Sequence, residues 1–348
     1  MKPLHKPLRQ LQRGISLVEL LVGMTLGLLL LGALASLYAS TSQSRVQLNN
    51  SATQIENGRY ALDVIGQEVG LAGFMGDLNL LGASAIATPD VCAVATNALG
   101  FTNSPATVPV AIYGYAPGTN PATCLPNLWP QSEILVVRRV STTALPSVAN
   151  MVAGQTYLQD SFCTTDTVPF VFSSTATDFT LHDKTCTGPA ELRQVSVRAF
   201  YIATCDMCNG NDNGVYTLKV AELSGGVMQP NSIAQGVEDV HFAYGVDVDG
   251  NGSPDCYVAN PGIDNSAVCN NVGGYNWNTS AVANWSNVTA VRINLLARTL
   301  NPAPGWTDNR TYDLGRGANA MVQPTNKSYK RHVYAEVARA ANVAGPRE

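Results

Sequence analysis

Side-chain oxygens recur at alternate positions in the stretch Asp247-Val-Asp249-Gly-Asn251-Gly-Ser-Pro-Asp255. Ca²⁺ takes roughly six to eight oxygen ligands in flexible geometry, so Asp247, Asp249, Asn251 and Asp255 are candidate ligands of a structural Ca²⁺ ion. An EF-hand is not expected, because Val258 stands where that loop supplies a bidentate Glu, and no helical pattern flanks the stretch. A calcium loop of another kind and an ordinary Asp/Asn/Gly turn both fit, and we favour the turn. No cofactor is required on either interpretation.

Eight cysteines offer a second kind of chemistry, and all of them lie beyond the apolar N-terminal segment. They are Cys92, Cys124, Cys163, Cys186, Cys205, Cys208, Cys256 and Cys269. Their even number fits an oxidising compartment, in which paired thiols staple long loops. Sequential pairing (92–124, 163–186, 205–208 and 256–269) is favoured because short loops close most easily, although the sequence leaves other pairings open. The CxxC spacing of Cys205 and Cys208 also occurs in redox and zinc sites, but no second CxxC and no βαβ pattern accompany it.

Patterns that mark an enzyme or a nucleic-acid-binding protein are missing from the sequence. The four histidines are scattered, and there is no GxSxG elbow, HExxH helix or Walker A loop. Beyond the basic N-terminus, acidic residues outnumber basic ones, so we expect no nucleic-acid partner. We therefore predict a protein without catalytic activity. A membrane-tethered enzyme is the alternative, which a pocket with clustered titratable residues would favour.

The N-terminus joins a short basic segment to a long apolar one. Residues 1–14 contain bases and no acid, and the run from Ile15 to Ala39 contains one charge, Glu19. That run exceeds the roughly 20 residues that cross a bilayer as a helix, and the basic flank predicts a cytoplasmic N-terminus. A carboxylate in such a run costs about 2.5–3.5 kcal/mol on insertion, so Glu19 should have a partner. Cleavage between Gly14 and Ile15 would provide one, because the new α-amine could meet Glu19 of a staggered neighbouring helix.

The segment Gly14-Ile15-Ser16-Leu17-Val18-Glu19-Leu20 resembles the prepilin motif of type IV pilins and type II secretion pseudopilins. The resemblance implies that a prepilin peptidase cleaves after Gly14 and methylates the amine of Ile15. It also implies that Glu19 pairs with the N-terminal amine of a neighbouring subunit in a filament. Ile15 departs from the Phe or Met that is commoner there. The alternative is a plain signal anchor in which the Gly and the Glu occur by chance.

A helical pattern continues beyond the apolar run. Apolar residues recur at spacings of three, four and seven, namely Leu48, Ala52, Ile55, Leu62, Ile65 and Val69. No proline occurs from Ile15 to Asp77, and the glycine cluster Gly70, Gly73 and Gly76 ends the pattern. We expect one helix from Ile15 to about Val69, whose second half packs this apolar stripe on the globular part of the chain.

Strand patterns dominate the remainder. Residues 77–131 are rich in Pro, Gly, Ala and Thr and are expected to be loops. The strand candidates are Glu133–Val140, Val168–Ser173, Phe179–His182, Gln194–Ala203, Val215–Glu222, Val237–Tyr244, Ala290–Thr299 and His332–Arg339. The predicted fold class is α+β, a long N-terminal helix with a membrane-spanning and an amphipathic half, packed on a predominantly antiparallel β domain. The expected segments are a leader (1–14), a transmembrane and filament-core helix (15–39), its amphipathic continuation (40–76) and an extracytoplasmic, disulfide-bonded β-rich domain (77–348).

Three further stretches are similar to PilW-type minor pilins of type IV pili. They are Asn57-Gly58-Arg59-Tyr60-Ala61 followed by Gly73-Phe74, Gly236-Val-Glu-Asp-Val240 running into Tyr244-Gly-Val-Asp247, and Val291-Arg-Ile-Asn-Leu-Leu-Ala-Arg298. The resemblance implies an inner-membrane protein with a single helix and a periplasmic domain that later reaches the pilus and cell surface. It implies priming of pilus assembly with other minor and major pilins, the prepilin peptidase and a PilY-type tip adhesin. A J-type pseudopilin of type II secretion and a membrane-anchored, calcium-dependent adhesin are the alternatives.

Overall fold

The computed structural model describes residues 14–76, 78, 85–103, 105–119, 123–209, 214–269, 274–317 and 320–345. The expected leader lies outside these ranges, except for Gly14. The chain divides into two compact units, Met1–Ser51 and Ala52–Glu348. One helix runs through the boundary between the units, and the sheets belong to the second unit.

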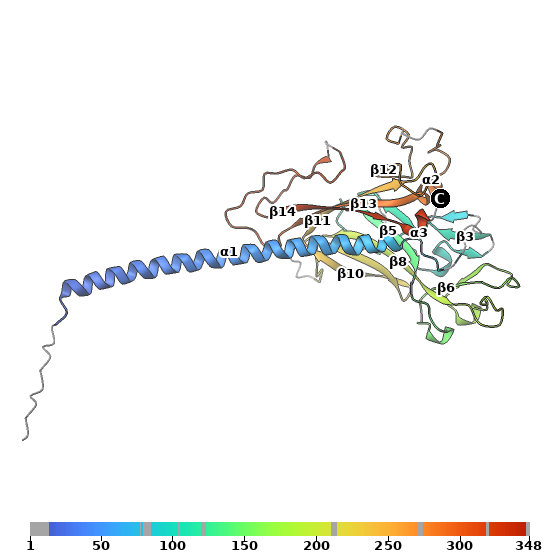
Figure 1. Ribbon diagram of the computed structural model, residues 1–348, viewed down its shortest axis with the longest axis horizontal. Helices are drawn as coiled ribbons and strands as arrows, with labels where there is room; N and C mark the ends of the chain where they lie inside the picture. Colours follow the sequence, from blue (N-terminus) through green and yellow to red (C-terminus); the bar gives the residue numbers. More distant parts are fainter. Residues whose placement is uncertain are drawn as a thin grey trace, which may run out of the picture. The chain divides into compact units, whose positions relative to one another are not determined.

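The helix α1 (Leu17–Leu71) is 55 residues long, so the predicted long helix is confirmed to within two residues at each end. It is drawn in blue in Figure 1. The helix ends where Gly73 adopts a φ of +73° and donates its N–H to the carbonyl of Arg138 at 3.0 Å. Glycine is favoured after a helix C-terminus because it adopts this left-handed conformation without a Cβ clash. The bond to Arg138 attaches the end of α1 to strand β5 (Ile134–Val140).

The second unit contains short and long strands and two short helices. The other strands are β1 (Ala85–Ala87), β2 (Thr102–Asn103), β3 (Ala106–Pro109), β4 (Ile112–Tyr115), β6 (Tyr157–Asp160), β7 (Phe170–Ser173), β8 (Leu192–Ala203), β9 (Thr217–Ser224), β10 (Val227–Gln235), β11 (Val237–Val246), β12 (Cys256–Val258), β13 (Val288–Arg298) and β14 (Arg331–Arg339). The short helices are α2 (Ala281–Ser286) and α3 (Ala341–Ala344).

The strands form three sheets in the described part of the chain. The largest has the order β10-β9-β8-β5-β4, with β6 pairing β8 and β7 pairing β6. The second has the order β12-β11-β13-β14, and all pairings in these two sheets are antiparallel. The small third sheet, β1-β3-β2, contains one parallel pairing, between β1 and β3. The α+β layout with predominantly antiparallel sheets is therefore confirmed (Figure 1).

Seven of the eight predicted strands are confirmed, as β5, β7, β8, β9, β11, β13 and β14. The eighth, Phe179–His182, is wrong, and only an isolated bridge between His182 and Pro189 occurs there. The side chain of Gln159 accepts the N–H of Leu181 at 3.0 Å and donates to the carbonyl of Ala190 at 3.0 Å. A side chain therefore takes the place of a partner strand, and no ladder is needed to satisfy this backbone.

No strand is predicted for residues 77–131, but β1 to β4 lie there. Each has only two to four residues, too few to show a clear alternation of apolar and polar side chains. Phe101 and Val108 of this region share a buried cluster with Val136 of β5 and Val197 of β8. Residues 85–115 thus pack into the same core as the largest sheet. The unpredicted β10 contains Pro230, which an edge strand tolerates because one of its sides needs no donors.

One face of α1 lies in the core that the two large sheets share. Ala61, Ile65 and Val69 belong to the same buried cluster as Phe200 of β8 and Phe242 of β11. Burying a large apolar side chain contributes about 1.5–3 kcal/mol. The C-terminal part of the predicted stripe is therefore confirmed, and it joins the helix to both sheets.

The N-terminal part of the predicted stripe is wrong. Leu48 is 71% exposed and Ile55 is 44% exposed, whereas the polar residue Gln54 is buried. The amide of Gln54 donates to the carbonyl of Ala297 at 2.7 Å and to that of Lys330 at 3.2 Å. These bonds satisfy the buried amide, so the buried face of α1 begins at a polar residue that hydrophobic periodicity passes over.

An ion network holds the buried face of α1 against the largest sheet. Glu68 is buried and accepts two hydrogen bonds from Arg139 of β5, at 3.0 and 3.1 Å. Arg198 of β8 also donates to Glu68, and it donates to Glu222 of β9 at 2.8 Å. Removing one partner of such a buried pair costs about 3–5 kcal/mol, because the other charge is left uncompensated.

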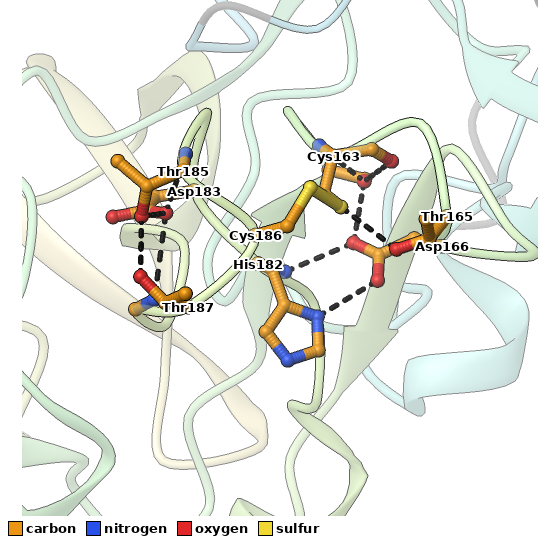
Figure 2. The surroundings of a disulfide bond; sticks show 10 residues. Cys163, Thr165, Asp166, His182, Asp183, Thr185, Cys186 and Thr187 are labelled. Atoms are coloured by element: carbon orange, nitrogen blue, oxygen red, sulfur yellow. Dashed lines mark hydrogen bonds and ion pairs between the residues drawn. A yellow bond between two sulfur atoms is a disulfide. The ribbon is translucent and has the colours of Figure 1, made fainter.

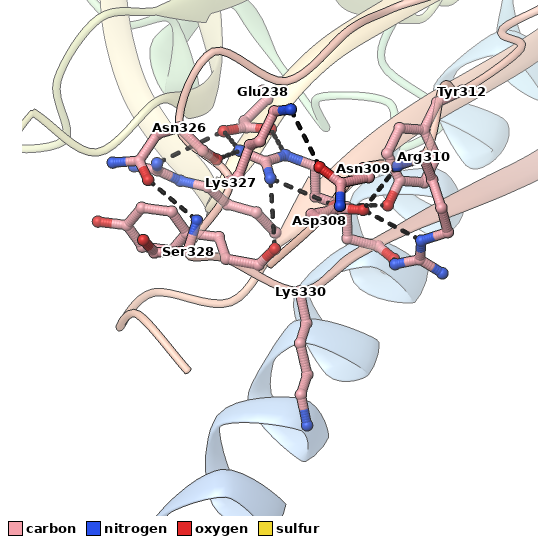
Figure 3. A network of polar contacts seen from close by, with 12 residues as sticks. Glu238, Asp308, Asn309, Arg310, Tyr312, Asn326, Lys327, Ser328 and Lys330 are labelled. Atoms are coloured by element: carbon pink, nitrogen blue, oxygen red, sulfur yellow. Dashed lines mark hydrogen bonds and ion pairs between the residues drawn. The ribbon is translucent and has the colours of Figure 1, made fainter. Parts of the chain in front are cut away.

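A second network anchors the long loop between β13 and β14 (Figure 3). Arg331 donates to Glu238 of β11 at 3.0 Å and to Asp308 of the loop at 3.4 Å. Tyr312 donates its hydroxyl to Asp308 at 2.7 Å. Burial alone would raise the pKa of Asp308, but the hydrogen bonds from Tyr312 and Arg310 outweigh it and hold that pKa below its ordinary value. The loop is therefore fixed to the sheet as an ordered part of the fold.

The close approach of α1 to β14 generates a testable prediction. A Cβ at Gly58 would collide with the ring of Tyr334, so Gly58→Ala should lower the free energy of unfolding by about 1–3 kcal/mol. Gly70→Ala is the matched control, because a Cβ there meets nothing closer than 3.9 Å and alanine favours a helix by about 1 kcal/mol. Urea unfolding of the full chain in detergent, followed by tryptophan fluorescence, measures both. Equal stability of Gly58→Ala and the wild type would contradict the close approach.

Candidate functional site

The described chain begins with three non-helical residues, Gly14 to Ser16. A Cβ at Gly14 would meet nothing within 4 Å, and Ile15 is 77% exposed. The peptide bond between Gly14 and Ile15 therefore lies in an accessible segment just before α1.

Ser16 and Glu19 cap the start of α1. The hydroxyl of Ser16 accepts the N–H of Val18 at 3.2 Å, and the carboxylate of Glu19 accepts the N–H of Ser16 at 3.1 Å. The S-x-x-E spacing is typical of such a capping box, and a carboxylate in the first turn also interacts favourably with the helix dipole. Within one chain Glu19 thus already has a hydrogen-bond donor. The apolar run predicts only a partner on another subunit for Glu19, although the S-x-x-E spacing alone indicates the cap.

The first half of α1 presents an uncovered apolar surface. The helix is long and apolar enough to cross a membrane by length and composition, and none of its most apolar window is buried. Large apolar side chains are exposed from Leu17 to Tyr38. Soluble proteins rarely expose a continuous apolar surface of this extent, so lipid or other apolar helices must cover it.

Four disulfides staple the second unit. They join Cys92 to Cys124, Cys163 to Cys186, Cys205 to Cys208, and Cys256 to Cys269. These pairs coincide with the sequential pairing that short loops favour. The CxxC pair is a disulfide within the turn after β8, and no free cysteine occurs among the described residues.

The Cys163–Cys186 disulfide joins two loops that an ion pair also connects (Figure 2). Nδ1 of His182 lies 2.8 Å from Asp166, which also accepts the backbone N–H of His182 and the hydroxyl of Ser161. The hydrogen bonds from Ser161 and His182 hold the pKa of Asp166 at about 2. This histidine is therefore part of a loop staple.

The three aspartates of the candidate calcium loop come together. The carboxylate oxygens of Asp247, Asp249 and Asp255 lie within 4.8 Å of one another. Asn251 lies beside them and donates its side-chain amide to Asp249 at 2.9 Å. The structure therefore gathers all four of the oxygen-bearing residues that the spacing singles out.

The same carboxylates also organise the backbone of the loop. Asp247 is buried and accepts the N–H of Gly250 at 2.7 Å and that of Gly252 at 2.8 Å. Asp255 accepts the N–H of Val248 at 2.8 Å. Side-chain acceptors bound to backbone donors a few residues away are typical of Asx turns. The arrangement favours the turn interpretation, and calcium binding stays a prediction.

A buried charged cluster that the sequence analysis does not predict joins β5, β11 and the β13–β14 loop. Glu133 accepts hydrogen bonds from Nδ1 of His241 at 2.8 Å and from Arg316 at 2.9 Å. Arg316 also donates twice to Asp239, at 2.7 and 2.8 Å. Burial disfavours the charge on Glu133, but His241 and Arg316 outweigh it, so the pKa of Glu133 lies below its ordinary value. Burial raises the pKa of Asp239 despite its bonds to Arg316.

Comparison with known proteins gives matches at both ends of the chain. Residues 199–342, from the end of β8 into α3, match the model of the family described as Type IV Pilus-assembly protein W. Residues 9–35 match the Prokaryotic N-terminal methylation motif. No significant match was found among curated proteins or among solved structures. The chain thus carries the PilW segment of type IV pilus-assembly proteins behind an N-terminal methylation motif, which is the combination expected of a PilW-family pilin.

Proposed function

We propose that the protein is a minor pilin that primes type IV pilus assembly and acts without catalysis. The observation that carries the proposal is the division of α1. Its first half exposes an apolar surface of membrane-spanning length, and its second half, from Gln54 onward, is built into the β-rich unit. The two family matches fall on these two parts of the chain and support the same proposal.

Processing is the first step that the proposal requires. The leader keeps the N-terminus in the cytoplasm while residues 15–39 insert into the inner membrane, and the β-rich unit lies in the periplasm. A prepilin peptidase then cuts after Gly14 and methylates the new amine of Ile15. The accessible, non-helical position of this bond suits the cut.

Assembly follows from an exchange of hydrogen bonds at Glu19. In the single chain its carboxylate accepts the N–H of Ser16. In a filament it pairs with the cationic amine of Ile15 on a neighbour, and a charge-assisted bond is roughly twice as strong as a neutral one. Leu48 and Ile55, exposed beyond the membrane segment, extend the apolar surface available to neighbouring helices.

The partners are other minor pilins, the major pilin and a PilY-type tip adhesin, which the protein would meet at the pilus tip and the cell surface. A J-type pseudopilin of type II secretion would use the same N-terminal chemistry. The PilW match of residues 199–342 supports the pilus over the secretion machine.

Mass spectrometry of the N-terminal peptide from host membranes tests the processing. We expect a mature chain that begins at N-methylated Ile15. Gly14→Val should retain the leader, because the resemblance implies that the peptidase requires the small residue before the cut. A wild-type chain with an intact leader, or one cut beyond Ala39, would show that the protein is not processed as a pilin.

Glu19→Gln tests the pairing step. The variant keeps an acceptor for the N–H of Ser16 but loses the charge, so insertion and cleavage should continue while incorporation into pili falls about tenfold or more. Glu56→Gln, at an exposed position of the same helix, is the control. Immunoblots of sheared pili against membrane fractions give the ratio. Unchanged incorporation of Glu19→Gln would rule out the proposed pairing.

We propose that the Asp247 loop needs no calcium, and metal removal tests this. Asp247→Ala leaves the buried N–H of Gly252 without an acceptor, so it should lower the free energy of unfolding by about 1–3 kcal/mol, in EDTA as in Ca²⁺. Asp249→Ala removes an exposed carboxylate and should cost less than about 1 kcal/mol. If Ca²⁺ instead raises the melting temperature of the wild type and EDTA reverses the rise, the loop is a structural calcium site, and the calcium-dependent adhesin gains support.

A further inference from the structure

A cavity of about 270 Å³ lies between β4, β11, β12 and the β13–β14 loop. Three tyrosines line it, Tyr115, Tyr244 and Tyr257, together with several glycine and alanine residues. Glu133, His241 and Arg316 of the buried charged cluster complete the wall. Pockets for drug-sized ligands measure roughly 300–1,000 Å³, so this cavity suits a single small ring.

The charged groups at the cavity are paired with one another. Glu133 receives hydrogen bonds from His241, Arg316 and the N–H of Phe242, and Arg316 forms a two-bond pair with Asp239. The two carboxylates and one guanidinium leave no excess positive charge for an anionic ligand, which would also meet the carboxylate of Glu133. A cationic ligand would compete with Arg316 for the same two carboxylates. The electrostatics therefore favour a neutral ligand.

Two polar atoms on the cavity wall, each from a residue that is otherwise buried, have no partner among the described residues. His241 is 4% exposed and uses Nδ1 for Glu133, while its Nε2 makes no hydrogen bond. Tyr244 is 3% exposed, and its hydroxyl, which lies against Gly114, makes none either. Neither atom is enclosed by protein, so both are open to the cavity, where the hydroxyl of a polar ligand can bond to them in place of water.

The chemistry of these atoms selects hydroxyl groups. With Nδ1 donating to Glu133, Nε2 accepts in a neutral imidazole and donates in an imidazolium, so a ligand hydroxyl, which can donate or accept, suits it in either form. The Tyr244 hydroxyl can donate or accept. A ligand hydroxyl can serve both atoms, because it too donates and accepts. Trp285 packs edge-on against Tyr244, with ring centroids 4.8 Å apart, and holds the tyrosine in place.

We infer that this cavity binds a neutral hydroxylated ring in the size class of one monosaccharide residue. The hydroxyls of the ring bond to His241 and Tyr244, and its apolar C–H face packs against the tyrosine walls. The inference does not rest on the proposed assembly function, because no residue of α1 lines the cavity.

Saturation-transfer NMR on the full chain tests the inference. The protein is held in micelles of a detergent without a sugar headgroup, and glucose, galactose, mannose and N-acetylglucosamine are added in turn. We expect transfer to at least one of them and, by calorimetry, a dissociation constant of about 1 mM or lower.

Three variants locate the binding. In His241→Asn the side-chain amide replaces Nδ1 at Glu133 but nothing replaces Nε2, so affinity should fall about tenfold. Tyr244→Phe removes only the hydroxyl and should weaken binding about fivefold or more. Ala259→Trp, at an exposed residue of the cavity mouth, should abolish binding by blocking entry. His332→Asn and Tyr60→Phe, outside the cavity, are matched controls.

Each possible outcome either supports or overturns the inference. Binding that Ala259→Trp abolishes and the two controls preserve supports the inference. No transfer to any of the four sugars, or transfer that Ala259→Trp leaves intact, would overturn it. Because Ala259 is exposed, this variant keeps the test decisive even if the buried substitution His241→Asn fails to fold, which unfolding curves of each variant reveal.

Discussion

Between Gln54 and Val69, one face of α1 lies in the core that both large sheets share. The apolar side chains of this face contact both sheets, and the pair between Glu68 and Arg139 adds a directional bond to the largest one. At Gly58 the helix passes so close to Tyr334 that no side chain fits between them. Withdrawing this face of the helix would uncover the core that both sheets share. The β-rich unit therefore depends on the second half of a helix whose first half is exposed.

The two halves of α1 have side chains that suit different surroundings. Up to about Ser51 the side chains are largely exposed. Those in the N-terminal stretch are mostly apolar, which suits lipid or neighbouring helices. From Gln54 the buried positions include polar groups, and each is satisfied by a bond to the sheets. A continuous helix can join these environments because its backbone satisfies its own hydrogen bonds in both. Movement of the apolar half from lipid into a filament therefore needs no refolding of the other half.

The sequence predicted the elements whose signals lie within a few consecutive residues. The apolar run, the glycine cluster after Val69 and the apolar stretches of β5, β8 and β13 can each be recognised from a few consecutive residues, and the elements that they predict were confirmed. Glu133, His241 and Arg316 could not be found in this way. Glu133 lies 108 residues from His241 and 183 from Arg316 along the chain, so only the completed sheets bring them together. The buried Gln54 escaped because its partners are carbonyls, which no sequence pattern reveals.

The residues that line the cavity are separate from those that α1 exposes, so the proposed assembly and the inferred ligand binding need not compete. Arg316 itself is tied to β11 through its bonds to Asp239 and to the carbonyl of Val240, so the cavity wall is held by the second unit alone. Glu133 and Asp239 are already paired with Arg316, and a neutral ligand leaves these pairs unchanged. In the proposed filament, by contrast, neighbouring subunits would engage the exposed apolar surface of α1 and Glu19. A subunit packed into a filament through its helix would therefore keep the cavity chemically intact, since the groups used for packing and those that line the cavity are separate.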